Sequence, residues 1–129
     1  MPNDEIGARV RTLAEAALSK KADRLVILDV EKLTSIADYF VICSAASDRQ
    51  ADAISDAVEE SLRKNHGAKP LMVEGRRSGR WMLLDYGDFI LHIFNEETRR
   101  FYNLERLWGD APEVTGEFVR EVPVGEAED

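Results

Sequence analysis

The sequence predicts a single α/β domain in which helices pack on a mixed β-sheet of about five strands. Segments of helical and strand periodicity follow one another in the order α-β-β-α-β-β-β-α, which is typical of this fold class. The chain has 129 residues, which is enough for one domain with its own hydrophobic core and hardly enough for two. No internal repeat divides the chain further.

The first part of the chain predicts a helix followed by two strands. Apolar residues recur at helical spacing between Ile6 and Leu18. The short apolar run 25–28 is typical of a buried strand. Residues 38–44 are rich in aromatic and β-branched side chains, which favour a second strand.

The middle of the chain predicts a second helix and a short third strand. Ser47 and Gln50 have the spacing of a capping box, and Gly67 is placed to end the helix that they open. Residues 71–73 then predict a strand, and residues 74–79 predict a turn.

Residues 81–86 and 89–94 predict two strands joined by a tight turn at residues 87–88. Because side chains alternate along a strand and cross-strand partners share a face, this register defines two faces. One face is apolar apart from a tyrosine hydroxyl, and we expect it beneath the helices: Met82, Leu84, Tyr86, Phe89, Leu91 and Ile93. The other face is mixed: Trp81, Leu83, Asp85, Ile90, His92 and Phe94.

The mixed face is a candidate binding surface. Burying a charged group without a partner is costly, so this composition suits a partly exposed sheet face with an aromatic anchor. In the alternative interpretation, another helix covers this face, and Asp85 and His92 satisfy each other locally. The pattern alone does not choose between the two.

The end of the chain predicts one more helix and an acidic tail. Asn95 can cap the helix and Gly109 can end it. The net charge is −8, and from Gly109 onward Arg120 is the only basic residue among many acidic ones. We therefore expect a domain over residues 1–112 and a flexible acidic tail over residues 113–129.

Composition and charge argue against several classes of function. An acidic chain has no general attraction to phosphate backbones, so we expect no direct DNA binding. No apolar run is long enough to span a membrane, and the acidic N-terminus is unlike a secretory signal. Cys43 is the only cysteine, which fits a reducing compartment. These features predict a cytoplasmic protein with no membrane contact.

Residues that could carry catalysis or bind a metal are sparse. Cys43, His66 and His92 are too few and too far apart for a structural metal site. Cys43 lies within an apolar strand, which favours an inert thiol over a nucleophile paired with His92. Asp85 and Asp88 could hold magnesium, but their spacing does not place both on one strand face. We expect no cofactor.

Several short motifs occur in a fixed order between about residues 4 and 112. They are DYFVICS (38–44), SDRQ (47–50), EG (74–75), GRW (79–81), LDYGD (84–88) and HIF (92–94), followed by Glu97, Arg99, FY (101–102), LE (104–105), LW (107–108) and DAP (110–112). Each motif alone is weak, but the ordered set is specific. The set resembles the ribosomal silencing factor family, also called Iojap-like.

The resemblance implies a mixed-sheet fold similar to the nucleotidyltransferases, but without enzymatic activity. It implies binding to the large ribosomal subunit through its fourteenth ribosomal protein, on the surface that faces the small subunit. Occupying that surface would block subunit joining and lower translation when nutrients are scarce.

The resemblance also implies a partner-binding surface around this part of the sheet, which agrees with the mixed face. We expect Trp81 to be the aromatic anchor. The other expected contacts are apolar side chains (Leu83, Ile90 and Phe94) and polar ones (Asp85 and His92).

Two alternative functions are also compatible with the sequence. One is a nucleotidyltransferase-like, magnesium-dependent enzyme that uses Asp85 or Asp88. The other is a homodimeric adaptor that acts off the ribosome and uses the same face to bind a second copy.

Overall fold

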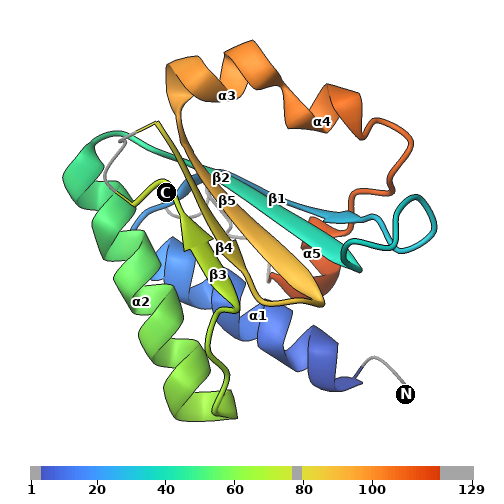
Figure 1. Ribbon diagram of the computed structural model, residues 1–129, viewed down its shortest axis with the longest axis horizontal. Coiled ribbons are helices and arrows are strands. Elements are labelled where there is room, and N and C mark those ends of the chain that lie inside the picture. Colours follow the sequence, from blue (N-terminus) through green and yellow to red (C-terminus); the bar gives the residue numbers. More distant parts are fainter. Residues whose placement is uncertain (1–3, 77–79, 120–129) are drawn as a thin grey trace, which may run out of the picture.

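One mixed sheet organises the computed structural model, which describes residues 4–76 and 80–119 (Figure 1). Its strands are β1 (Asp23–Asp29), β2 (Tyr39–Ala45), β3 (Met72–Glu74), β4 (Trp81–Asp85) and β5 (Phe89–Asn95). The 5-stranded sheet has the order β1-β2-β5-β4-β3. The pair β2 and β5 is parallel, and the other neighbouring strands are antiparallel. The predicted fold class is confirmed.

Helices lie on both faces of this sheet (Figure 1). On one face are α1 (Asp4–Ser19), α2 (Asp48–His66) and the short α5 (Thr115–Phe118). Over the other face run α3 (Glu96–Tyr102) and α4 (Leu104–Leu107). Within the described ranges, no helix has both the length and the apolar character needed to cross a membrane.

The hairpin register matches its prediction. Trp81 lies opposite Phe94, and Asp85 lies opposite Ile90. Tyr86 donates its backbone N–H to the Phe89 carbonyl oxygen, at 3.0 Å, and so closes the two-residue turn. The apolar face is buried beneath α1 and α2, as predicted: Met82, Leu84, Tyr86, Phe89, Leu91 and Ile93.

Helix α2 also begins and ends where its capping residues predict. The Ser47 side chain accepts a hydrogen bond from the Gln50 backbone N–H at 3.0 Å, and the Gln50 side chain accepts one from Ala46 at 2.6 Å. Gly67 ends the helix in the left-handed conformation, with φ of 64°.

The predicted last helix is broken into two. Asn95 caps α3 as expected, because its side chain accepts a hydrogen bond from the Thr98 backbone N–H at 2.8 Å. At Asn103, however, the backbone turns to the left-handed conformation with φ of 49°. Asparagine tolerates this conformation, and its side chain can accept a hydrogen bond from the first turn of the next helix. Asn103 does so with Arg106 at 3.3 Å, and thereby ends α3 and begins α4.

The expected flexible tail does not begin at residue 113. The Val114 backbone N–H donates to the Ile27 carbonyl oxygen at 2.8 Å, which attaches this segment to β1. Phe118 is only 8% exposed and packs edge-on against Tyr39. Residues 113–119 are therefore part of the packed domain, so the expected boundary at residue 112 falls inside it. The remaining expected tail, residues 120–129, lies outside the described residues.

A buried arginine joins α3 to the strands beneath it. Arg99 is 2% exposed and donates to the Glu105 carboxylate at 2.6 Å and 3.1 Å. The same guanidinium donates to the Ser44 hydroxyl and to the Arg24 carbonyl oxygen, both at 2.8 Å. One side chain thus connects α3, α4, β2 and β1.

Replacing Arg99 with methionine should destabilise the fold strongly. The substitution keeps a long apolar stem but removes the buried charge and leaves several polar groups without their donor. We expect the free energy of unfolding to fall by about 3 kcal/mol, as measured by urea titration. The control is Arg100→Met on the same helix, because Arg100 is 69% exposed and makes only a 3.5 Å ion pair. A loss there should be within about 0.5 kcal/mol. Equal losses in the two variants would contradict a special role for Arg99.

Candidate functional site

On the mixed face of the hairpin, the side chains of β5 are buried and those of β4 are partly exposed. Ile90 and His92 are each 6% exposed and Phe94 is 1% exposed, whereas Trp81, Leu83 and Asp85 are all half-buried. The difference arises because β5 lies between β2 and β4, and the chain returns from β5 through α3 and α4 over this face. The expectation that Ile90, His92 and Phe94 contact a partner directly is therefore corrected. The accessible predicted residues are those on β4.

Asp85 and His92 do not satisfy each other. The Asp85 carboxylate accepts a hydrogen bond from the Gly87 backbone N–H at 2.8 Å, within the hairpin turn. The His92 Nδ1 atom accepts one from the Trp81 indole Nε1–H at 3.1 Å. The covering-helix interpretation is thus correct for β5, but its local acid–histidine pair is not formed.

His92 fixes the orientation of the Trp81 ring. An Nδ1 atom that accepts a hydrogen bond must be unprotonated, so the proton of the neutral ring lies on Nε2. Burial lowers the pKa of His92 to about 4, which keeps the ring neutral at physiological pH. His92 is therefore a positioning residue for the indole.

An exposed aromatic surface continues from Trp81 onto α3. The Trp81 ring lies 4.8 Å from the Tyr102 ring, which in turn meets the Phe101 ring edge-on at 5.0 Å. Tyr102 is 49% exposed and Phe101 is 78% exposed. We call Trp81, Tyr102 and Phe101 the aromatic surface. A recess of about 450 Å³ lies beside it, lined by Arg80, Trp81, Asn95, Glu97, Thr98, Phe101 and Tyr102.

The sequence pattern does not predict that Tyr102 and Phe101 belong to this site. The sequence predicts one helix from Asn95 to Gly109, and that prediction does not indicate which of its side chains meet Trp81. In the structure the helix breaks at Asn103, and Phe101 lies in solvent. The available signal was the pair of adjacent aromatic residues directly before Asn103.

Gly75, in the turn before β4, packs closely against the backbone of Trp81. Gly75 has φ of 79°, a conformation that residues with side chains rarely adopt. A Cβ atom at this position would overlap the Trp81 carbonyl oxygen. Glycine is therefore needed at position 75, where the chain passes the start of β4.

The side chains considered for catalysis are not brought together. Cys43 is fully buried beneath α1 and α2, and burial raises the pKa of its thiol to about 12. His92 lies on the opposite face of the sheet, so no nucleophile–base pair forms. Among residues 4–76 and 80–119, no group of three or more His, Cys, Asp or Glu side chains could hold a metal ion.

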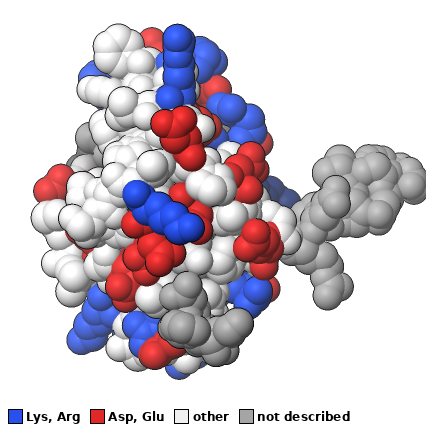
Figure 2. Space-filling view, turned by 90° about the vertical axis from the view of Figure 1, so that its right-hand side faces the viewer, with Lys and Arg blue, Asp and Glu red and all other residues white. Residues whose placement is uncertain are grey.

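Figure 2 shows the side of the molecule at the right of Figure 1. On this face, lysine and arginine side chains are interleaved with acidic ones. No broad basic surface that would attract a phosphate backbone is seen there among the described residues.

Comparison with known proteins identifies the family. The model of the family described as "Ribosomal silencing factor during starvation" matches residues 3–129. The chain belongs to the ribosomal silencing factor family. The resemblance seen in the sequence motifs is confirmed, and the family match extends through the acidic end of the chain.

Two curated relatives of this ribosomal silencing factor family member are similar to it over most of their length. The Bacillus subtilis protein named ribosomal silencing factor RsfS is 40% identical over 80% of this chain and 86% of its own. The protein of the same name from Halalkalibacterium halodurans is 37% identical over 92% of this chain and 98% of its own. A crystal structure of a Chromobacterium violaceum protein has a TM-score of 0.75 at 32% identity, covering 79% of this chain and 84% of that one.

His92 should make folding sensitive to mild acid. From its ordinary pKa of 6.5 down to about 4, the unfolded chain binds a proton that the folded chain excludes. The free energy of unfolding should therefore fall as the pH drops through this window. In His92→Phe the decrease between about pH 7 and about pH 5 should be smaller by about 2 kcal/mol, as measured by urea titration. An unchanged pH dependence in the variant would contradict a buried, neutral His92.

Proposed function

We propose that this protein binds the large ribosomal subunit through its fourteenth ribosomal protein and sterically blocks joining of the small subunit. Translation would thereby be repressed under nutrient limitation, in the cytoplasm. Membership of a family named for ribosomal silencing during starvation supports this function. The printed names of relatives at 37% to 40% identity support it further.

The aromatic surface is the observation that carries the proposal. Tryptophan and tyrosine are the residues most often found as energetic anchors of protein interfaces, because they bury a large area with few rotatable bonds. Trp81 is half-buried and is held by a 3.1 Å hydrogen bond to His92, so little freedom is left to lose on binding. Phe101 is 78% exposed and adjoins Tyr102, so the two rings form a contiguous exposed apolar area beside Trp81.

Half-buried side chains on β4 would complete the contact. Leu83 extends the apolar area next to Trp81, and the Asp85 carboxylate offers a negative charge at the far end of the strand. A carboxylate at the edge of an apolar contact suits a basic group on a ribosomal protein. Steric exclusion needs no chemistry, and a contact of about 800 Å² per partner is sufficient for a specific complex.

Trp81→Ala should weaken binding to the large subunit by about 2 kcal/mol or more, because a hot-spot ring is lost. The measurement is co-sedimentation of the protein with purified large and small subunits on sucrose gradients. The unchanged protein should pellet with the large subunit alone and reduce the amount of joined ribosomes. Its failure to associate with either subunit would overturn the proposed function.

A second pair of variants separates docking from folding. Phe101→Ala removes an exposed ring of the aromatic surface, whereas Leu107→Ala removes a side chain of α4 that is 71% exposed and outside that surface. Neither change touches the core, so both variants should keep the stability of the parent. Binding to the subunit should weaken only in Phe101→Ala. If Phe101→Ala alters self-association but not subunit binding, the aromatic surface serves a second copy and its ribosomal role fails.

A further inference from the structure

The chain covers one edge of the sheet and leaves the other edge open. At the β1 edge, Val114 donates its backbone N–H to the Ile27 carbonyl oxygen at 2.8 Å. Asp29 in turn donates to the Pro112 carbonyl oxygen at 2.9 Å. The opposite edge strand, β3, pairs with β4, and among residues 4–76 and 80–119 no strand pairs with its other side (Figure 1). An open edge presents backbone N–H and C=O groups to which another chain can add a strand.

The mixed face of the hairpin continues onto β3. On β4, Leu83 and Asp85 belong to this face. The cross-strand partner of Asp85 is Met72, and both therefore lie on the same side of the sheet. Glu74 lies on that side as well, because its partner is Leu83. Val73, between the two β3 residues, packs against the core on the other face, as strand alternation requires.

This part of the mixed face combines apolar and acidic side chains. Met72 is 45% exposed, and Glu74 is exposed as well. Within the described ranges Glu74 forms no ion pair. Asp85 accepts a hydrogen bond from the Gly87 backbone N–H at 2.8 Å, and a carboxylate can accept several more. Both acidic groups can therefore bind a further donor.

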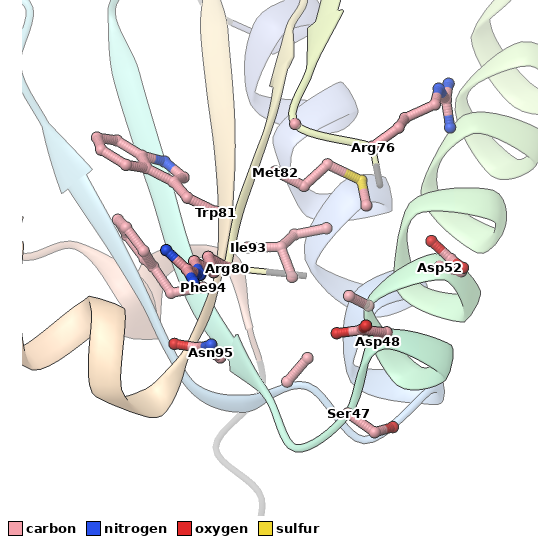
Figure 3. A pocket seen from close by; sticks show the side chains of 13 residues that line it. Ser47, Asp48, Asp52, Arg76, Arg80, Trp81, Met82, Ile93, Phe94 and Asn95 are labelled. Carbon is pink, nitrogen blue, oxygen red and sulfur yellow. The ribbon is translucent and has the colours of Figure 1, made fainter. Parts of the chain in front are cut away.

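The two arginines that follow β3 in the described chain do not neutralise these acidic groups. Arg76 points toward α2 (Figure 3), where it pairs with Glu59 at 2.7 Å. Arg80 lies beside Phe94 of β5 (Figure 3), and β5 adjoins β4 on the side away from β3. The surface along β3 therefore keeps its negative charge, which favours a basic partner.

The open edge and the charge together select the kind of partner. Side chains of an added strand would alternate between the two faces, so every second one would lie beside β3 on the mixed face. A lysine or arginine opposite Glu74 and an apolar side chain opposite Met72 would be favourable cross-strand pairs. Proteins that bind ribosomal RNA are rich in lysine and arginine, because these side chains neutralise phosphates.

We propose that β3 receives an extended basic segment of the ribosomal partner as an added strand. This inference rests on the proposed function, because it assigns a second contact to the same partner. Backbone hydrogen bonds along the open edge supply affinity, and the pairs with Met72 and Glu74 supply specificity. Leu83 lies between Trp81 and Asp85 on β4, so the new contact is continuous with the aromatic surface.

Hydrogen–deuterium exchange tests the strand addition. Exchange is measured by mass spectrometry on the protein alone and on its complex with purified large ribosomal subunits. Amides of residues 71–74 should exchange about tenfold more slowly, or slower still, in the complex. Amides of β1 serve as the control and should change little, because that edge is already covered.

The outcomes separate this inference from the proposed function. Unchanged exchange at residues 71–74 in a protein that co-sediments with the large subunit would overturn the strand addition alone. A lack of co-sedimentation would overturn the proposed function and this inference with it. Slower exchange at residues 71–74 that depends on the concentration of the free protein would assign the edge to a second copy, and would also overturn the proposal.

Two charge-reversal variants test the acidic contact. Glu74→Lys places a positive charge on the proposed surface, and Glu15→Lys makes the same change on α1, on the opposite face of the sheet. Both side chains are exposed, so both variants should fold. Affinity for the large subunit should fall about tenfold or more in Glu74→Lys and stay within about threefold in Glu15→Lys. Equal affinities in the two variants would overturn the proposal.

Discussion

The arrangement of the helices on the second face of the sheet depends on hydrogen bonds to one buried guanidinium, that of Arg99. Arg99 is 2% exposed, and a charge so deeply buried is tolerated only when it is paired and its donors are used. Glu105 from α4, Ser44 from β2 and a backbone carbonyl of β1 together meet that requirement. The interaction holds α3 and α4 over β2 and β5, which converts the second face of the sheet from a surface into a core. It also determines where Tyr102 meets Trp81.

Trp81 lies at the edge of the core that α3 and α4 cover, next to solvent. On one side, Phe94 belongs to the core between the sheet and α4, and the buried His92 ring stacks on it. On the other side, β4 and the end of α3 reach solvent. A ring at such a border is oriented by the core and still accessible to a partner. The neutral state of His92 matters here, because protonation at Nδ1 would remove the acceptor for the indole N–H. The packing that makes the fold rigid thus also prepares the aromatic surface.

Much of the fold could be predicted from local patterns, and the exceptions have physical causes of two kinds. The hairpin register followed from strand alternation and a two-residue turn, and the limits of α2 followed from its capping residues. Whether a helix covers Ile90, His92 and Phe94 could not be decided from the sequence, because it depends on where the chain returns after β5. The break at Asn103 depended on one residue adopting a left-handed conformation, and the docking of Phe118 depended on contacts with distant Tyr39. Long-range packing decided the covering of β5 and the docking of Phe118, whereas the break at Asn103 is a local conformational choice.

The burial of Cys43 has a practical consequence for studies of this chain. Its thiol is the only one in the sequence, has no solvent access and has a pKa of about 12, so thiol-reactive reagents will not modify it in the folded protein. The natural sequence is therefore a suitable background for single-site labelling. A cysteine introduced on an exposed helix position would be the one reactive thiol, and a fluorophore attached there could report distances to a partner without any change to the core.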